Sequence, residues 1–316
     1  MKKKWNITLI LLAFLVFFVY ILLKSESNYG TINIPQPGQE SPKKIEYIFE
    51  NNNALFPENI EIYKFKTPYY ESLQQIERLK NYFNIKNTTT KEDKDKILIL
   101  SEKKVIEIDK NNGYFSYINN EKLYNNKIYK NIPTDSEAIE IAKKFLIETK
   151  LFSGRFQSVS VTAQKAENEA GETVVMAKDV WFYPVVNGRP IYGISRIIVT
   201  IGNKGEIEAV CKYYRDFEFY KKEKLKSLEK AVQEIKEGRA SSNIPPEATK
   251  AHIKKSFLGY WEDPEQQYLI PVYVFQGETA INNKIEKFDI FTPAIENVEL
   301  VLNKNIDEEY FSTQKD

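Results

Sequence analysis

His252 and Cys211 are the side chains whose types most readily support catalysis or metal binding, and each is the only residue of its kind. One histidine and one cysteine cannot complete the usual zinc sites. His252 lies in an expected strand, residues 250–254, without an orienting partner near it, so we interpret it as a surface residue. Cys211 shares a strand face with Ile207 and Tyr213. We take this for the core face, where a thiol acts as a small apolar group.

Short catalytic motifs in the sequence do not identify an enzyme. The Ser-x-x-Lys acylation motif occurs three times, at Ser41/Lys44, Ser101/Lys104 and Ser227/Lys230. Its companion S-D-N and K-T-G elements are absent, so we reject a penicillin-binding function. The phosphate-, dinucleotide- and hydrolase-type glycine motifs are also absent.

Residues 109–113, Asp-Lys-Asn-Asn-Gly, resemble the start of a calcium loop, but the glycine stands at position five and Asn120 at position twelve. A hairpin turn explains these residues better. We therefore expect no catalytic residue, no cofactor-binding residue, no cofactor and no metal ligand. Paired catalytic carboxylates stay open, because nothing in the sequence singles out one pair.

Composition narrows the class of protein further. The 316 residues include 45 Lys and Arg and 44 Asp and Glu, a balance that argues against a dedicated nucleic-acid binder. Hydrophobic residues make up 42% of the chain, enough for a folded core. With a single cysteine, no intramolecular disulfide is possible, so stability must come from buried apolar surface.

The N-terminus predicts a membrane anchor. Residues 5–23 form an almost unbroken apolar run, preceded by Lys2, Lys3 and Lys4 and followed by Lys24. As a helix the run would be about 28 Å long, the thickness of a bilayer core. The lysines predict residues 1–4 in the cytoplasm and the rest outside, as a single-pass protein of the cell membrane. A cleaved signal peptide is the alternative, although its apolar core is usually shorter.

The remaining sequence divides into a linker, three units and a tail. Residues 24–44 are rich in Pro, Gly and Ser and predict a flexible linker. Residues 45–132 predict a small α+β domain, with a strand containing Ile60 and Ile62 and a helix over 71–84. Residues 303–316 form a polar tail. Whether residues 45–132 pack on the later units stays open.

Residues 133–220 and 221–302 predict one element used twice, a helix followed by an antiparallel meander. Thr134 and Glu137 have capping-box spacing at the start of the first helix. Asn187-Gly188 predicts a type I′ hairpin turn. In the second unit, Ser227 is the expected N-cap. The predicted fold class is therefore α+β: an N-terminal transmembrane helix followed by repeated helix-plus-antiparallel-sheet units.

The pattern resembles the YycH/YycI group of Gram-positive proteins, and the unit is similar to PepSY-type domains. The resemblance rests on the anchor and on S-E-A-I-E-I-A at 136–142, F-Y-P-V-V-N-G-R-P-I-Y-G at 182–193, G-E-I at 205–207, Y-L-I-P-V-Y-V-F at 268–275 and residues 288–294. It implies a non-enzymatic accessory protein that regulates a sensor histidine kinase of a two-component system. The anchor departs from small-xxx-small spacing, so its helix contacts would rest on Leu and Phe.

We therefore expect a membrane-anchored, extracytoplasmic protein that works by protein–protein contact. Its expected partners are the membrane, which it contacts through residues 5–23, and a membrane protein such as a sensor histidine kinase. A PepSY-type binding or inhibitor module and a cell-wall enzyme with an unrecognised site are the alternatives. The partner's identity, the sign of regulation and the oligomeric state stay open. Large aromatic residues are the expected partner contacts: Trp181, Tyr183, Tyr192, Tyr260, Trp261 and Tyr273.

Overall fold

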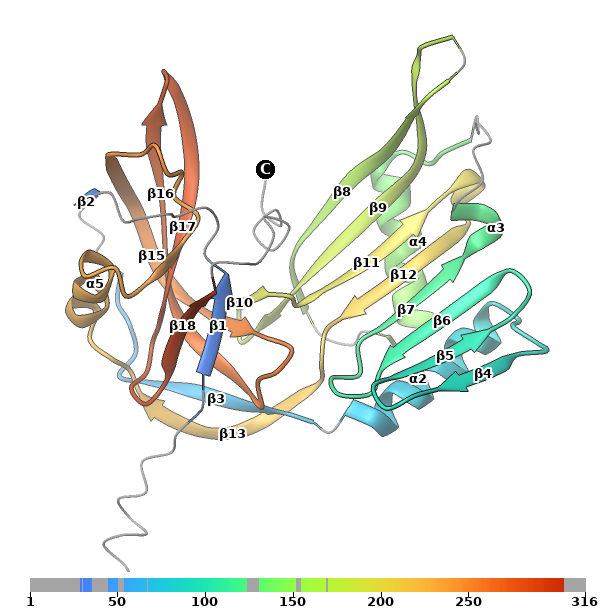
Figure 1. Ribbon diagram of the computed structural model, residues 1–316, viewed down its shortest axis with the longest axis horizontal. Helices are drawn as coiled ribbons and strands as arrows, with labels where there is room; N and C mark the ends of the chain where they lie inside the picture. The colour runs from blue at the N-terminus through green and yellow to red at the C-terminus, as the bar shows by residue number, and fades with distance from the viewer. Residues whose placement is uncertain are drawn as a thin grey trace, which may run out of the picture.

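The computed structural model describes Tyr29 and residues 31–35, 45–50, 54–66, 68–123, 131–151, 155–168 and 170–303. Strands dominate these residues, and most of them belong to one mixed sheet of 16 strands. Buried apolar side chains form two separate clusters, which define two lobes. The lobes stand at an angle to one another and meet where their strands end (Figure 1).

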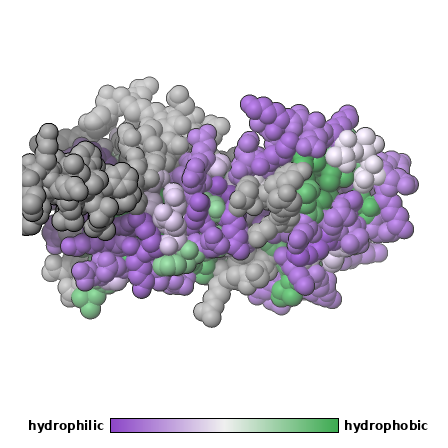
Figure 2. Space-filling view, turned by 90° about the horizontal axis from the view of Figure 1, so that it is seen from below, coloured by the Kyte–Doolittle hydropathy of each residue, from purple (hydrophilic) through white to green (hydrophobic). Residues whose placement is uncertain are grey.

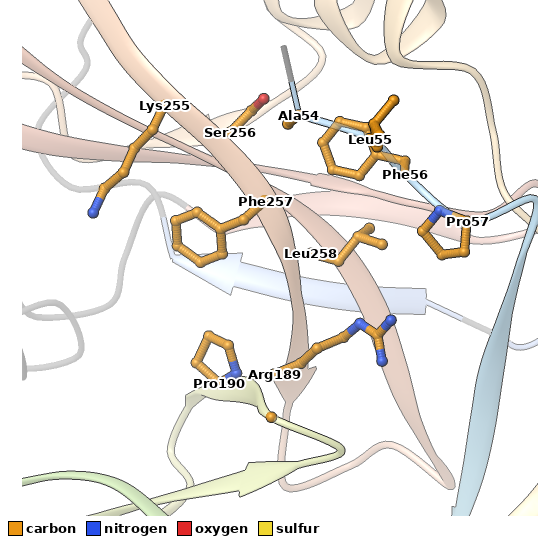
Figure 3. Close-up of a pocket in the computed structure, with 11 residues that line it drawn as sticks. Ala54, Leu55, Phe56, Pro57, Arg189, Pro190, Lys255, Ser256, Phe257 and Leu258 are labelled. Carbon is orange, nitrogen blue, oxygen red and sulfur yellow. The ribbon is translucent and has the colours of Figure 1, made fainter. Parts of the chain in front are cut away.

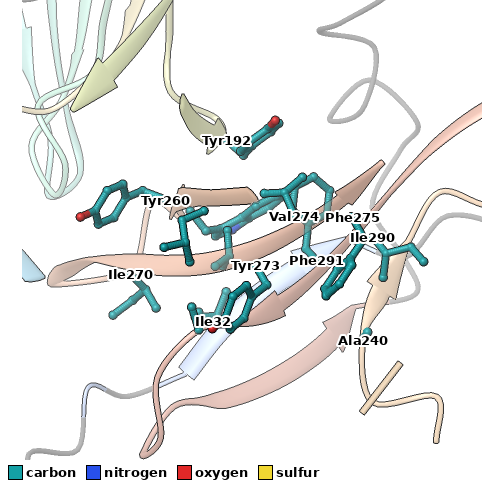
Figure 4. Close-up of a cluster of buried hydrophobic side chains, with 14 of the residues drawn as sticks. Ile32, Tyr192, Ala240, Tyr260, Ile270, Tyr273, Val274, Phe275, Ile290 and Phe291 are labelled. Atoms are coloured by element: carbon teal, nitrogen blue, oxygen red, sulfur yellow. The ribbon is translucent and has the colours of Figure 1, made fainter. Parts of the chain in front are cut away.

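The first lobe combines segments from both ends of the described chain. Its elements are β1 (Thr31–Pro35), β2 (Glu46–Phe49), β3 (Asn59–Phe65), β13 (Phe217–Lys224), α5 (Leu228–Lys236), β14 (Ser241–Ser242), β15 (Lys250–Glu262), β16 (Tyr268–Ile281), β17 (Lys284–Pro293) and β18 (Glu299–Asn303). β3 pairs with β13 and with the start of β16, so residues far apart in sequence share this lobe. Its core is dense in aromatic rings (Figure 4).

The second lobe is formed by the chain between β3 and β13. Its elements are α2 (Pro68–Tyr82), β4 (Thr89–Glu92), β5 (Lys96–Leu100), β6 (Lys104–Asp109), β7 (Phe115–Asn119), α3 (Asn120–Leu123), α4 (Asp135–Glu148), β8 (Arg155–Glu167), β9 (Thr173–Val186), β11 (Arg196–Ile201), the 3₁₀ turn η1 (Asn203–Gly205) and β12 (Ile207–Tyr213). The strands lie in the order β8-β9-β11-β12-β7-β6-β5-β4. α2 and α4 bury their apolar side chains against this sheet.

The strand β10 (Arg189–Gly193) joins the two lobes. It forms a hairpin with β9 and a parallel pair with β15, where Gly193 lies opposite Glu262. The hairpin turn is Asn187-Gly188, with φ of 49° and 75°, as expected for the predicted type I′ turn. A Cβ on Gly193 would lie 2.2 Å from the Glu262 carbonyl oxygen, so only glycine allows the strands to approach this closely.

Local predictions from the sequence are confirmed. Thr134 Oγ1 accepts a hydrogen bond from the Glu137 amide, and the Glu137 carboxylate accepts one from the Thr134 amide over 2.8 Å, completing the capping box. Ser227 caps α5 through the Lys230 amide. The Asp109 side chain accepts from the Asn111 amide in the turn after β6, so this segment is the predicted turn.

The predicted fold class is wrong. Instead of two repeated helix-plus-meander units, the described chain forms one large mixed sheet, and the expected boundary at 132/133 falls within it: β7 pairs with β12. The physical reason is that alternating apolar residues predict a strand but not its partner. Distant pairs such as β3 with β13 and β10 with β15 therefore decide the architecture.

The prediction of a single-pass membrane protein is also corrected. Among the described residues, no helix is long and apolar enough to cross a bilayer. The expected anchor, residues 5–23, the cytoplasmic tip 1–4 and most of the linker and tail lie outside the described residues. We therefore do not propose a membrane localisation for this protein. An apolar run in a sequence is not sufficient for a membrane span, because the segment must also form a long helix.

Candidate functional site on the uncovered sheet face

The sheet of the second lobe has two chemically different faces. Val180, Val199 and Val210 lie side by side in register on one face and are fully buried beneath the helices. The next row, Trp181, Ile198 and Cys211, faces the other way and is only half-buried. Figure 1 shows α4 on the far side of β9 and β11. We call the side not covered by α2 and α4 the uncovered face.

Arg196 lies on this face at the start of β11, between two aromatic rings. Its guanidinium carbon is 5.8 Å from the Trp181 ring centre and 5.7 Å from the Tyr213 ring centre. The indole of Trp181 is held in place by a 2.9 Å hydrogen bond from its Nε1 to Thr162 Oγ1 on β8. β8, β9, β11 and β12 thus each contribute one side chain to a cation–π cluster.

The charge of Arg196 is not matched by any acid among the residues that the structure describes. Its Nε and Nη1 atoms are buried and have no hydrogen-bond acceptor. Arg215, by contrast, forms a 2.9 Å ion pair from Nε to Glu262 and donates to the carbonyl oxygens of Asp263 and Gln266. Since a buried donor without a partner costs roughly 1–3 kcal/mol, Arg196 is held at an energetic cost.

The cluster continues into the first lobe. The Tyr213 ring meets Tyr114 edge-on at 5.9 Å, and the Tyr114 hydroxyl donates to Glu262 Oε1 over 2.9 Å. Burial, with the nearby carboxylate of Glu262, raises the pKa of Tyr114 far above its ordinary value, so this hydroxyl stays protonated. Arg215 completes the contact by lying 3.6 Å above the Phe65 ring.

Two other groups that could take part in chemistry, Asp179 and Cys211, lie on the uncovered face. Asp179 accepts hydrogen bonds from Gln164 and from Thr200 Oγ1. Cys211 lies on this face and not on the helix-covered core face, which corrects the sequence interpretation. Both faces of β12 carry apolar residues, so the pattern does not reveal which one the helices cover. Burial raises the pKa of the Cys211 thiol, which disfavours the reactive thiolate.

His252 and the acidic residues do not form a metal site. His252 is half-buried on β15, opposite Glu278 on β16. No group of three or more histidine, cysteine, aspartate or glutamate side chains within the described ranges is arranged to hold a metal ion.

Of the six predicted contact residues, Trp181 is the one that is half-exposed. Tyr183 lies on the same face but is 8% exposed, and Tyr192, Tyr260, Trp261 and Tyr273 are buried in the first-lobe core. Figure 4 shows three of these tyrosines within the apolar cluster. The sequence analysis missed Arg196 and Tyr213 as site residues. Their role depends on the register of β9, β11 and β12, which no short motif encodes.

Two of the hollows lined by described residues lie at the first lobe. One, of about 510 Å³, is lined by Ala54, Leu55, Phe56, Pro57, Gly188, Arg189, Pro190, Lys255, Ser256, Phe257 and Leu258. In Figure 3 the charged ends of Arg189 and Lys255 point away from each other, so they do not converge on one ligand. The other, of about 560 Å³, lies between α5 and the strands and has apolar walls that include Leu228, Val232 and Phe275.

Comparisons with known proteins add little. No protein-family model and no curated protein matches the sequence. Among solved structures, the chain is similar to an uncharacterized protein from Eubacterium rectale, with a TM-score of 0.45 and 12% identity over 83% of this chain and 92% of that chain. It is also similar to the YpeB C-terminal domain of Bacillus megaterium, with a TM-score of 0.35 and 15% identity over 77% and 100%. Both TM-scores are below 0.5, so neither likeness supports a functional argument, and the resemblance to YycH and YycI stays a prediction.

Proposed function

We propose that this protein is a non-catalytic binding module that acts by protein–protein contact through the uncovered face. The observation that carries the proposal is the Trp181–Arg196–Tyr213 cluster on a sheet face that α2 and α4 leave open. Trp, Tyr and Arg are the residue types that contribute most to binding energy at protein interfaces. Here the three lie together and are half-exposed on the uncovered face.

The composition of the surrounding face supports the same function. Small side chains, Ser116, Ser160 and Cys211, lie in register in the row through Trp181, so a partner can approach the sheet closely. Seen from below, the described surface of the molecule is largely hydrophilic, and its hydrophobic residues form small separate patches (Figure 2). That side therefore presents no broad apolar surface to a partner.

As partner we propose a sensor histidine kinase of a two-component system, which the protein would regulate. The support for this choice is the resemblance of the sequence to YycH and YycI. It is tested by mixing the full chain with the purified sensor kinases of the host and measuring autophosphorylation. A change in rate that depends on Trp181 supports regulation and gives its sign, whereas unchanged rates for every kinase contradict this choice of partner.

The binding function itself is tested by partner capture from the native host. The tagged full chain is compared with Trp181→Ala and with Ile285→Ala, which removes an exposed apolar side chain from β17 in the other lobe. We expect at least one protein that wild type and Ile285→Ala retain equally and that Trp181→Ala retains about tenfold less, as for the loss of an interface hot spot. Equal retention by all three chains contradicts the proposal.

A further inference from the structure

We propose that Arg196 is the docking point for a carboxylate group of the protein partner, carried on an acidic segment of its chain. The inference rests on the proposed binding function and goes further by naming the chemistry that the uncovered face recognises. It starts from the Arg196 side chain, which is half-exposed on this face and forms no ion pair with a described residue.

Asp179 and Glu107, which lie on the same face, do not form ion pairs with Arg196. Asp179 accepts hydrogen bonds from Gln164 and Thr200, and Glu107, in register with Ser116, is paired with Lys96. Arg196 and Asp179 act in opposite directions on the Cys211 thiol: burial raises its pKa most, Asp179 raises it further and Arg196 lowers it. Arg196 therefore has no ion-pair partner among the described residues, although the carboxylate of Asp179 lies on the same face.

The two rings hold the guanidinium in place before a ligand arrives. Trp181 and Tyr213 each lie within 6 Å of its carbon, and Trp181 is itself anchored to Thr162. Holding a long side chain in one position removes most of the entropy cost of forming a charge-assisted hydrogen bond. A planar, always charged guanidinium also matches a carboxylate better than a lysine does.

The native Cys211 provides a tether for the test. It is the only cysteine of the chain, is half-exposed on the same face, and lies near enough for Arg196 to affect its pKa. The full chain is equilibrated with two disulfide-activated peptides, acetyl-Cys-Gly-Glu-amide and acetyl-Cys-Gly-Gln-amide, in graded 2-mercaptoethanol. Mass spectrometry then gives the fraction of Cys211 captured by each peptide.

We expect the glutamate peptide to withstand about tenfold more 2-mercaptoethanol than the glutamine peptide, which is the size of one charge-assisted hydrogen bond. The preference should vanish in Arg196→Gln and survive in part in Arg196→Lys. Ser160→Cys in a Cys211→Ser background gives a second tether on the same row of the face. Equal capture of both peptides, a preference that persists in Arg196→Gln, or no capture from either position overturns the inference.

Partner capture separates this inference from the proposed function. If Trp181→Ala loses the partner while Arg196→Gln retains it, the uncovered face binds the partner but a carboxylate at Arg196 is not what it recognises. If the peptides show the expected preference but no host protein is retained, the carboxylate site stands and the proposed protein partner is wrong.

Discussion

Tyr114 donates a 2.9 Å hydrogen bond to Glu262, and this contact joins the two lobes across 148 residues of sequence. Glu262 is buried at the end of β15, where Arg215 supplies the matching charge. Tyr114 in turn meets Tyr213, which lies against Arg196. The candidate site and the lobe junction therefore share one chain of contacts.

Tyr114→Phe should destabilise the protein by about 1–2 kcal/mol, because it removes a donor from a buried carboxylate while the ring contact with Tyr213 remains. Urea unfolding of the full chain measures the change. Tyr82→Phe is the matched control, since Tyr82 is 45% exposed and packs through its ring. A loss of the same size in both variants would contradict the role given to the Tyr114 hydroxyl.

Arg196→Met should stabilise the free protein by about 1 kcal/mol. The substitution removes buried donors without acceptors and keeps an apolar chain between the two rings. Arg215→Met should have the opposite effect, a loss of about 3–5 kcal/mol, because it leaves Glu262 buried without its ion pair. Thermal or urea unfolding distinguishes the two. A marked loss of stability in Arg196→Met would show that Arg196 serves the fold and not a ligand.

Glu208 predicts a pH dependence of stability. It is buried, its Oε1 has no hydrogen-bond partner among the described residues, and burial raises its pKa above the ordinary carboxyl value. Below the pKa of the unfolded chain, both states are protonated and the stability contribution is fully present. As the pH rises through the higher pKa of the folded state, the folded protein must lose a proton that it holds more tightly, so stability falls.

Glu208→Gln should therefore match wild type near pH 4 and exceed it increasingly toward pH 8, by about 1.4 kcal/mol for each pKa unit that separates the folded from the unfolded state. Urea unfolding across this pH range gives the difference. Glu140→Gln is the control, because the Glu140 side chain is 71% exposed and its ion pair with Lys143 lies at the surface. A pH-independent difference between Glu208→Gln and wild type would rule out this explanation.

Gly193→Ala should cost about 3 kcal/mol or more, since the new methyl group meets the Glu262 carbonyl oxygen and φ is +89°. Gly188→Ala has a similar φ of +75° but no atom within 4 Å of the added Cβ, so we expect about 1 kcal/mol. The difference between the two unfolding free energies isolates the clash between β10 and β15. Equal costs would mean that the strands separate easily.

Signals that act over a few residues were readable from the sequence. The capping box of Thr134 and Glu137 and the Asn187-Gly188 turn each depend on neighbours within four positions, and both are present. The pairing of β3 with β13 could not be read in the same way, because many alternating segments are equally good strands. The expected repeated units failed for this reason.

The candidate site was predictable only in part. Trp181 could be named as a large aromatic residue in the predicted meander of residues 133–220. Arg196 and Tyr213 are recognised as site residues only because they lie next to Trp181 in the sheet. Predicting this placement requires the register of three strands. Cys211 was placed with the right strand neighbours but on the wrong face, since a period of two tells which residues share a face and not what covers it.

The insertion of the second lobe between β3 and β13 has a consequence for synthesis on the ribosome. All residues of the second lobe have been made before Phe217, so this lobe can complete its fold first. β3 cannot pair until its partner strands β13 and β16 have been synthesised. At a synthesis rate of about 5–20 residues per second, the edge of β3 stays unpaired for on the order of ten seconds. A chaperone that acts on nascent chains would bind this edge during that interval.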